Sequence, residues 1–328
     1  MMPRDGTSIR ARRLPSIAAR AVVHVVATLV MVVGSACEGD PATAIAPSPP
    51  GPAPPPLDVS GWVSASVGTM PLVLVVPHGG DLAPAVLPDR GCTGCETAND
   101  ANTQELALEL ATAFERRVGR RPFVVINRLH RRKFDANRER IEATGGHAPL
   151  DAQWVLLHEQ IDSAKARALR VHTRALLVDL HGHAHSVARL ELGYLLSAGA
   201  LRLPDSTLTP LVAGASVSRL SAQAVSGDRG AALVRGPRAL GTRLAAAGYP
   251  SVPSAGDRAP NEGDAYFSGG YNTERHGSRA GGGVDAVQLE CNFTGVRDTP
   301  ASRGAFAEAL VTALLAFLGD HYGWSASG

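Results

Sequence analysis

The chain has 328 residues, of which 45% are hydrophobic and 19% are charged. This length is enough for one large α/β domain or for two smaller ones. The formal net charge is only +2, and no basic stripe crosses the part expected to fold, which excludes a nucleic-acid partner.

Residues 1–37 are typical of a secretory signal peptide. Several arginines precede an apolar run from Ala21 to Val33, which is shorter than the roughly 20 residues that span a bilayer. The small residues Gly34, Ser35 and Ala36 then lead to Cys37, as in a bacterial lipobox, although Gly34 stands where Leu or Val is usual. We therefore expect export to the periplasm or the cell surface. Simple cleavage and lipid anchoring through Cys37 both stay open, and membrane contact is expected only through such an anchor.

A proline-rich segment follows at residues 38–58, and its composition predicts an extended, disordered linker. Residues 59–328 are expected to form a single domain. Within it, Cys92 and Cys95 form a lone CxxC pair in a Gly-rich loop. A disulfide is allowed outside the cytoplasm. We favour a local bond between these two cysteines, while a bond from either of them to Cys291 stays open.

The folded part alternates between continuous apolar runs, which indicate buried strands, and helical patterns. In chain order the sequence predicts a strand at Leu72–Pro77, a helix opened by Asp100 with Asp100 or Asn102 as its cap, a strand at Pro122–Asn127, a helix at Trp154–Val171, strands at Ala175–Leu180 and Leu190–Ser197, a helix at Arg238–Gly248, a strand at Val284–Glu290 and a helix at Arg303–Tyr322. This order predicts a three-layer α/β/α fold around a mostly parallel sheet.

Three of these strands are followed by, or end in, an ionisable residue: His78, His181 and Glu290. In parallel sheets, ligands bind beyond the carboxyl ends of the strands, so these side chains are expected to meet at one edge. A zinc hydrolase holds its ion with three protein ligands and keeps a position open for water. Two histidines therefore need a third ligand, for which the residues offer Asp81 and Asp100.

The densest polar cluster is the segment from Asp179 to His185, which contains three alternating histidines. We take His181 as the metal ligand because it directly follows the apolar run. Asp179 is expected to bond a ligand histidine and to fix its tautomer. His183 and His185 are expected to support the ligands or to face the substrate. The alternative is a solvated loop that is rich in histidine.

Two further segments are candidates for substrate binding. In residues 130–138, Arg131 or Arg138 would bind a carboxylate with two guanidinium nitrogens or stabilise an oxyanion. Asp135 would position either arginine. The Gly-rich, aromatic segment 266–277 would line the substrate pocket. The alternatives are a basic surface loop for the first and a surface turn for the second. The residues assigned to substrate binding are Asn137, Arg138, Gly270, Tyr271 and Arg275.

Taken in order, these motifs resemble the N-formylglutamate amidohydrolase family, which is distantly similar to the zinc carboxypeptidases and aspartoacylases. The resemblance covers residues 70–295. The matching segments are Pro77-His78-Gly79-Gly80, Asp100 with Thr103 and Leu106, Arg131 with Asp135-x-Asn137-Arg138, Asp179-Leu180-His181, Gly227-Asp228-Arg229-Gly230, Gly269-Gly270-Tyr271 and Gln288-Leu289-Glu290.

The resemblance implies a phosphorylase/hydrolase-like fold and one Zn²⁺. It favours Asp100 over Asp81 as the third ligand, because the family's acid opens the helix after the first histidine's loop. It also implies that Glu290 is the catalytic carboxylate and that Arg131 assists it.

Asn292-Phe293 departs from the Asn-Arg pair that often follows the family's glutamate, which argues against formylglutamate itself. The expected function is zinc-dependent hydrolysis of an amide bond in a carboxylate-bearing N-acyl amino acid or peptide. The alternatives are a metal-dependent esterase or deacylase and a non-catalytic surface binding protein.

Overall fold

The structure, a computed structural model, describes residues 58–327. The predicted signal peptide and all of the predicted linker except Asp58 lie outside the described residues, so both stay predictions.

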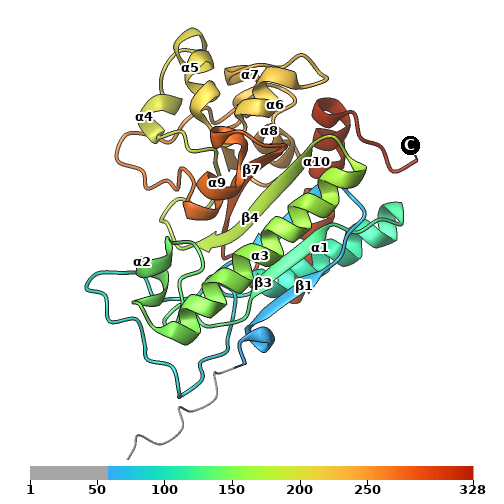
Figure 1. Ribbon diagram of the computed structural model, residues 1–328. Coiled ribbons are helices and arrows are strands. Elements are labelled where there is room, and N and C mark those ends of the chain that lie inside the picture. Colours follow the sequence, from blue (N-terminus) through green and yellow to red (C-terminus); the bar gives the residue numbers. More distant parts are fainter. Residues whose placement is uncertain (1–57, 328) are drawn as a thin grey trace, which may run out of the picture. The chain divides into compact units, whose positions relative to one another are not determined.

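The described part is built around one seven-stranded sheet with the strand order β1-β3-β2-β4-β7-β5-β6 (Figure 1). Neighbouring strands are parallel except at two pairs, β1 with β3 and β5 with β7. The sheet is therefore mixed and mostly parallel, as predicted. The strands are β1 (Val63–Ser66), β2 (Leu72–Val76), β3 (Phe123–Asn127), β4 (Ala175–His183), β5 (Leu190–Gly193), β6 (Ser251–Val252) and β7 (Val284–Asn292).

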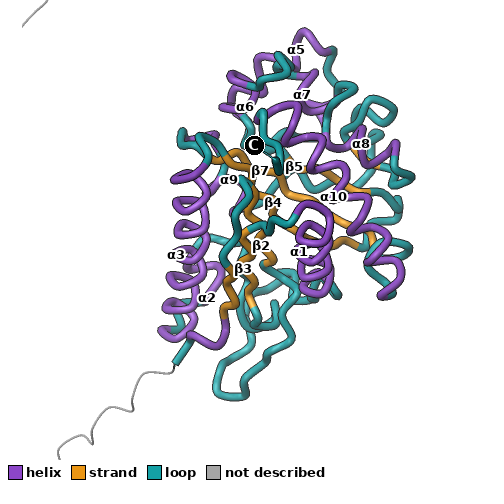
Figure 2. The backbone as a smooth tube through the Cα atoms, turned by 90° about the vertical axis from the view of Figure 1, so that its right-hand side faces the viewer, coloured by secondary structure: helices purple, strands orange, loops and turns teal. Residues whose placement is uncertain are grey.

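Helices cover both faces of the sheet, and Figure 2 shows α3 on one side with α1 and α10 on the other. The helices are η1 (Ser60–Trp62), α1 (Thr103–Val118), α2 (Arg140–Thr144), α3 (Ala148–Val171), α4 (Ala198–Leu201), α5 (Asp205–Leu211), η2 (Val212–Gly214), α6 (Ser218–Gln223), α7 (Ala231–Arg235), α8 (Leu240–Ala246), α9 (Tyr271–His276), η3 (Ser278–Ala280) and α10 (Pro300–Tyr322). The three-layer prediction is confirmed.

Strand β2 shows why the apolar runs are continuous. Leu72, Leu74 and Val76 belong to the core that includes α1 and α10, whereas Val73 and Val75 belong to the core beneath α3. Successive side chains of a strand point to opposite faces. Because both faces are covered, every position of this strand must be apolar.

Several predicted boundaries are wrong. Strand β4 continues to His183 and β7 to Asn292, because their backbone ladder extends through the polar residues beyond the apolar runs. Strand β5 ends at Gly193 and pairs antiparallel with β7. Helix α3 begins at Ala148, well before the predicted start.

Of the two predicted helix caps, Asn102 is correct in position and Asp100 is wrong. Helix α1 starts at Thr103, and Asn102 occupies the cap position with a left-handed φ of 66° and no capping hydrogen bond from its side chain. The Asn102 amide donates instead to the carbonyl of Arg297. Asp100 lies before the helix, where its carboxylate is free for another use.

The cysteines behave as the favoured prediction expected. Cys92 and Cys95 form a disulfide with a Cα–Cα distance of 5.7 Å. Cys291 is buried in β7 as a free thiol, so its pairing with either of the other two is excluded.

Candidate metal centre

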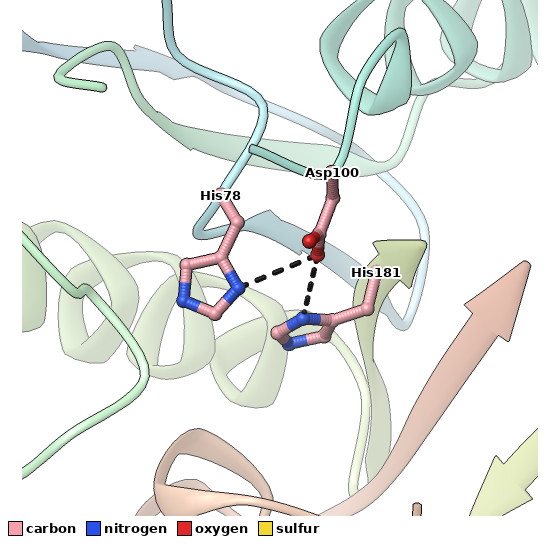
Figure 3. A group of neighbouring side chains, drawn as sticks. All are labelled: His78, Asp100 and His181. Atoms are coloured by element: carbon pink, nitrogen blue, oxygen red, sulfur yellow. Dashed lines mark hydrogen bonds and ion pairs between the residues drawn. The ribbon is translucent and has the colours of Figure 1, made fainter. Parts of the chain in front are cut away.

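Three buried side chains converge at the carboxyl edge of the sheet (Figure 3). His78 follows β2, His181 lies in β4, and Asp100 ends the loop that leads into α1. Oδ2 of Asp100 lies 3.3 Å from Nδ1 of His78 and 3.1 Å from Nδ1 of His181. The centres of the two imidazole rings are 4.8 Å apart. The backbone N–H of Asp100 donates to the carbonyl of His78 at 3.0 Å, which brings the two ends of the intervening loop together.

Both histidines present Nδ1 to the shared carboxylate and use Nε2 for a second one. Nε2 of His78 lies 2.7 Å from Asp135, and Nε2 of His181 lies 3.1 Å from Asp179. Metal-binding histidines characteristically donate the N–H that faces away from the ion to such a carboxylate. At His78, the hydrogen bond to Asp135 keeps the proton on Nε2 and leaves the lone pair of Nδ1 for a ligand. At His181, Oδ2 of Asp179 has no hydrogen-bond partner among the described residues, and Nε2 has Asn137 as its hydrogen-bond partner.

The converging atoms fit a divalent cation. Nδ1 of His78 is buried and has no hydrogen-bond partner among the described residues. Two imidazole nitrogens and one carboxylate oxygen match a common ligand set of zinc. Asp81, the other candidate ligand, is exposed and does not belong to this group.

The charges of the site favour a cation as well. Burial acts to raise the pKa of Asp100, but the two facing histidines hold that pKa well below its usual range. Burial acts to lower the pKa of His181, yet the carboxylates of Asp179 and Glu290 raise it well above its usual value. The site thus stabilises positive charge, and a metal ion would take the place of a proton there.

Glu290 lies next to this group on β7, in register with His181 of β4. Its Oε1 is 3.9 Å from Nδ1 of His181 and accepts a hydrogen bond from Gln288 at 2.7 Å. Its Oε2 is buried without a hydrogen-bond partner among the described residues. Burial, together with the negative charges of Asp100 and Glu191, raises the pKa of Glu290 to about 8 against the opposing effect of His181.

Arg131 also reaches the group. Its Nη1 lies 3.6 Å from Oδ1 of Asp100, and its Nε lies 3.2 Å from Oδ2 of Asp135. The sequence predicted that Asp135 positions this arginine. It missed the shorter contact of Asp135 with His78, because only the folded chain brings residues 57 positions apart together.

Asn137 and Asn272 form a buried layer beside His181. Nδ2 of Asn137 lies 3.3 Å from Nε2 of His181, and its Oδ1 accepts from the backbone N–H of Asn272. The Asn272 amide in turn contacts Asp179. Asn137 was assigned to the substrate, whereas its observed contacts are with the histidine and with α9. No sequence signal pointed to Asn272.

The other residues assigned to the substrate lie outside the ion-binding group. Arg138 pairs with Glu142 at 2.8 Å. Gly270 packs so closely on Asn137 and Gln288 that a side chain would not fit there. Tyr271 accepts a hydrogen bond from Arg275 at 3.3 Å. The guanidinium of Arg275 also lies 5.0 Å from the ring centre of Trp154, which the sequence analysis did not single out.

His183, His185 and Glu191 form a second group of residues with ligand atoms. Nε2 of His183 donates to the carbonyl of Arg189 at 2.8 Å, and its Nδ1 accepts from the backbone N–H of His185 at 3.1 Å. Because both nitrogens of His183 are used within the protein, this group is a hydrogen-bonded network rather than a second ion site.

Neither a protein-family model nor a curated protein sequence matches the chain. Solved structures that resemble it in fold include the following three. One is N-formylglutamate amidohydrolase from Ralstonia eutropha, at 13% identity over 76% of this chain and 94% of that chain, with a TM-score of 0.46. A gene product of Agrobacterium tumefaciens has 13% identity, 77% and 94% coverage and a TM-score of 0.47. A bacteriophage poly-gamma-glutamate hydrolase has 15% identity, 78% and 89% coverage and a TM-score of 0.33. Such values concern the fold alone.

Proposed function

We propose that this protein is a zinc-dependent hydrolase that cleaves an amide bond in an N-acyl amino acid or a peptide-like substrate. The observation that supports it best is the buried group of His78, Asp100 and His181. Beside it lies a carboxylate oxygen of Glu290 that has no hydrogen-bond partner within residues 58–327. His78, Asp100 and His181 would hold the zinc ion.

The chemistry divides between the ion and the side chains around it. When bound, zinc would act as a Lewis acid that lowers the pKa of water, so that loss of a proton gives a nucleophile near neutral pH. Glu290 takes up the proton of the attacking water at Oε2, the oxygen without a hydrogen-bond partner among the described residues, and delivers it to the leaving nitrogen.

Arg131 is the side chain best placed to bind the substrate. Its guanidinium lies beside Asp100 and is only 11% exposed. A guanidinium donates hydrogen bonds to a carboxylate or to a developing oxyanion. We therefore propose a substrate that carries a carboxylate, which is also true of the glutamate compounds named for two of the similar structures.

Export is part of the same proposal. The signal-like N-terminus would direct the enzyme to the periplasm or the cell surface, with or without a lipid on Cys37. Its substrates would then be acyl amino acids or peptides found outside the cytoplasm.

The proposal is tested with the purified chain, by metal analysis and by hydrolysis of N-formyl-L-glutamate, N-acetyl-L-glutamate, γ-linked glutamate oligomers and the corresponding esters. For whichever substrate is cleaved, Glu290→Gln should keep stoichiometric zinc and lose about 10²–10⁴-fold in rate. Glu159→Gln, at an exposed position of α3, is the matched control and should behave like the wild type. Unchanged hydrolysis by a zinc-loaded Glu290→Gln variant would contradict the role of Glu290. Cleavage of the esters alone would make the enzyme an esterase.

A further inference from the structure

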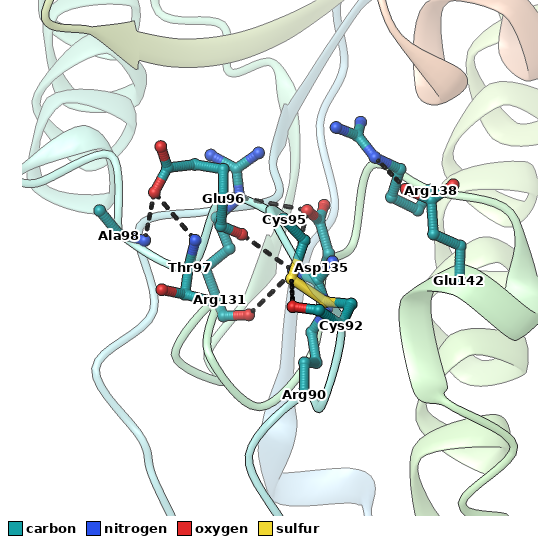
Figure 4. Close-up of a disulfide and its surroundings, with 10 residues drawn as sticks. All are labelled: Arg90, Cys92, Cys95, Glu96, Thr97, Ala98, Arg131, Asp135, Arg138 and Glu142. Atoms are coloured by element: carbon teal, nitrogen blue, oxygen red, sulfur yellow. Dashed lines mark hydrogen bonds and ion pairs between the residues drawn. A yellow bond between two sulfur atoms is a disulfide. The ribbon is translucent and has the colours of Figure 1, made fainter.

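The loop of residues 79–99 joins two of the residues that would bind the ion, His78 and Asp100. It contains the Cys92–Cys95 disulfide and a buried arginine, Arg90. Figure 4 shows the disulfide beside Arg90, with Asp135 close to the same guanidinium. The sequence analysis gave this loop no role beyond its disulfide.

Arg90 is held at both its backbone and its side chain. Its backbone N–H donates to the carbonyl of Arg132 at 2.7 Å. Its side chain is only 3% exposed, and Nη1 donates to Oδ2 of Asp135 at 3.1 Å and to the carbonyl of Glu96 at 3.1 Å. A buried charge is costly unless it is paired, so the contact between Arg90 and Asp135 is an essential part of this arrangement.

Asp135 connects Arg90 to the ion-binding group. Its Oδ2 faces Arg90 and Arg131, whereas its Oδ1 lies 2.7 Å from Nε2 of His78. The backbone N–H of Asn137 also donates to Oδ1. The two arginines therefore fix the plane of the carboxylate, and that plane fixes the His78 ring.

In the sequence, the disulfide lies between the two residues of the loop that are joined by a hydrogen bond, Arg90 and Glu96. Cys92 and Cys95 stand between Arg90 itself and Glu96, whose carbonyl accepts from Arg90. Cys92 is exposed, so the bond is accessible to solvent. Opening it would free the segment that carries both partners of this hydrogen bond.

We propose that Arg90 is a positioning residue for His78, that it acts through Asp135, and that the Cys92–Cys95 disulfide keeps Arg90 in place. The zinc affinity of the protein then depends on a loop that touches no ligand atom directly. This inference rests on the zinc site of the proposed function.

The test is the zinc dissociation constant of the full chain, measured by competition with a chromophoric chelator. Arg90→Met and Arg90→Lys should each weaken zinc binding about 10-fold, at the lower end of the effect of residues that orient a ligand. Arg132→Met is the matched control, because it also removes a positive charge, from the segment next to the loop. The Arg132 side chain is 48% exposed, so the zinc affinity of this variant should equal that of the wild type.

The sign of the change separates positioning from simple charge. Removing a nearby positive charge would by itself tighten the binding of a cation. A tighter Arg90→Met variant, or wild-type affinity in both Arg90 variants, would therefore overturn the inference. A wild type that binds no zinc would overturn the proposed function and this inference together, so the two failures are distinguishable.

A double-mutant cycle tests the route through Asp135. If Arg90 acts through that carboxylate, Arg90→Met should have little further effect on zinc affinity in an Asp135→Asn background. Additive losses of zinc affinity in the double variant would overturn the route through Asp135. Additivity is what a purely structural role of Arg90, independent of Asp135, would give. Circular dichroism of each variant without zinc checks that the fold is kept, and Arg90→Lys retains the charge if Arg90→Met does not fold.

The role of the disulfide is tested with the double variant Cys92→Ser/Cys95→Ser. Its zinc affinity should fall several-fold, within the range of the Arg90 variants. Wild-type affinity in the folded double variant would overturn the part of the inference that concerns the disulfide.

Discussion

A substitution at Gly182 should lower the stability of the protein next to two of the proposed zinc ligands, His181 and Asp100. Gly182 lies in β4 next to His181, and its backbone N–H donates to Oδ2 of Asp100 at 3.1 Å. A Cβ atom at this position would lie 2.5 Å from Nε and from Nη2 of Arg297. That guanidinium is buried, so Gly182→Ala must displace it.

The cost can be worked out from the bonds of Arg297. Its Nε donates to the carbonyl of Cys291 at 3.0 Å, its Nη1 to that of Ala101 at 2.5 Å and its Nη2 to that of His183 at 3.1 Å. A hydrogen bond from a charged group contributes about 1.5–3 kcal/mol. Losing two of the three, with part of the loss recovered by water, predicts that Gly182→Ala lowers the free energy of unfolding by about 3 kcal/mol.

Urea unfolding of the zinc-free chain measures this change. Gly304→Ala is the control, because a Cβ built there has no atom within 4 Å apart from its chain neighbours and the backbone of its own helix, as far as the structure describes the chain, and because alanine favours a helix over glycine. In an Arg297→Met background, Gly182→Ala should lower the free energy of unfolding much less, because the guanidinium that clashes with the new Cβ is absent. Wild-type stability of Gly182→Ala, or an unchanged cost in the Arg297→Met background, would refute the reasoning.

Two further predictions concern buried polar groups. Burial, together with the neighbouring His276, lowers the pKa of His158 to about 3. The folded state then stays neutral while the unfolded chain takes up a proton below its pKa of about 6.5, so stability is present above that pH and is lost as the pH falls. At pH 5 this amounts to about 2 kcal/mol, from 1.5 units at 1.36 kcal/mol each, and His158→Gln should lose correspondingly less between pH 7 and pH 5 in urea unfolding. An equal loss in both proteins would contradict the assignment. The hydroxyl of Tyr194 is buried without a hydrogen-bond partner among the described residues, so Tyr194→Phe should raise the unfolding free energy by about 1 kcal/mol. A destabilised Tyr194→Phe variant would mean that the hydroxyl is bonded in solution.

The layers of the fold could be predicted because they depend on local patterns. A short apolar run such as Leu72–Pro77, rich in β-branched residues and followed by glycines, indicates a strand buried on both faces, because alternate side chains pack into the cores on opposite sides of the sheet. The same runs indicated where His78, His181 and Glu290 emerge. The ends of β4 and β7 were missed because backbone pairing between two strands, rather than hydrophobicity, carries the ladder through their polar residues.

The family resemblance favoured Asp100 over Asp81 as the third ligand, but only the tertiary structure determines where each of the two carboxylates lies. Both acids belong to the chain that follows His78, and spacing alone cannot say how that chain returns. It doubles back until the backbone of Asp100 bonds that of His78, which brings the carboxylate to both imidazoles and leaves Asp81 in solvent.

The sequence by itself thus determined the layers of this protein and the strands from which its reactive side chains emerge, because hydrophobic periodicity is a local property of the chain. The tertiary structure alone decided which carboxylate faces which histidine, that Arg90 bonds Asp135 and that Arg297 packs on Gly182. Those contacts join residues 45 and 115 positions apart, and they form only when separate elements pack against one another in one particular order.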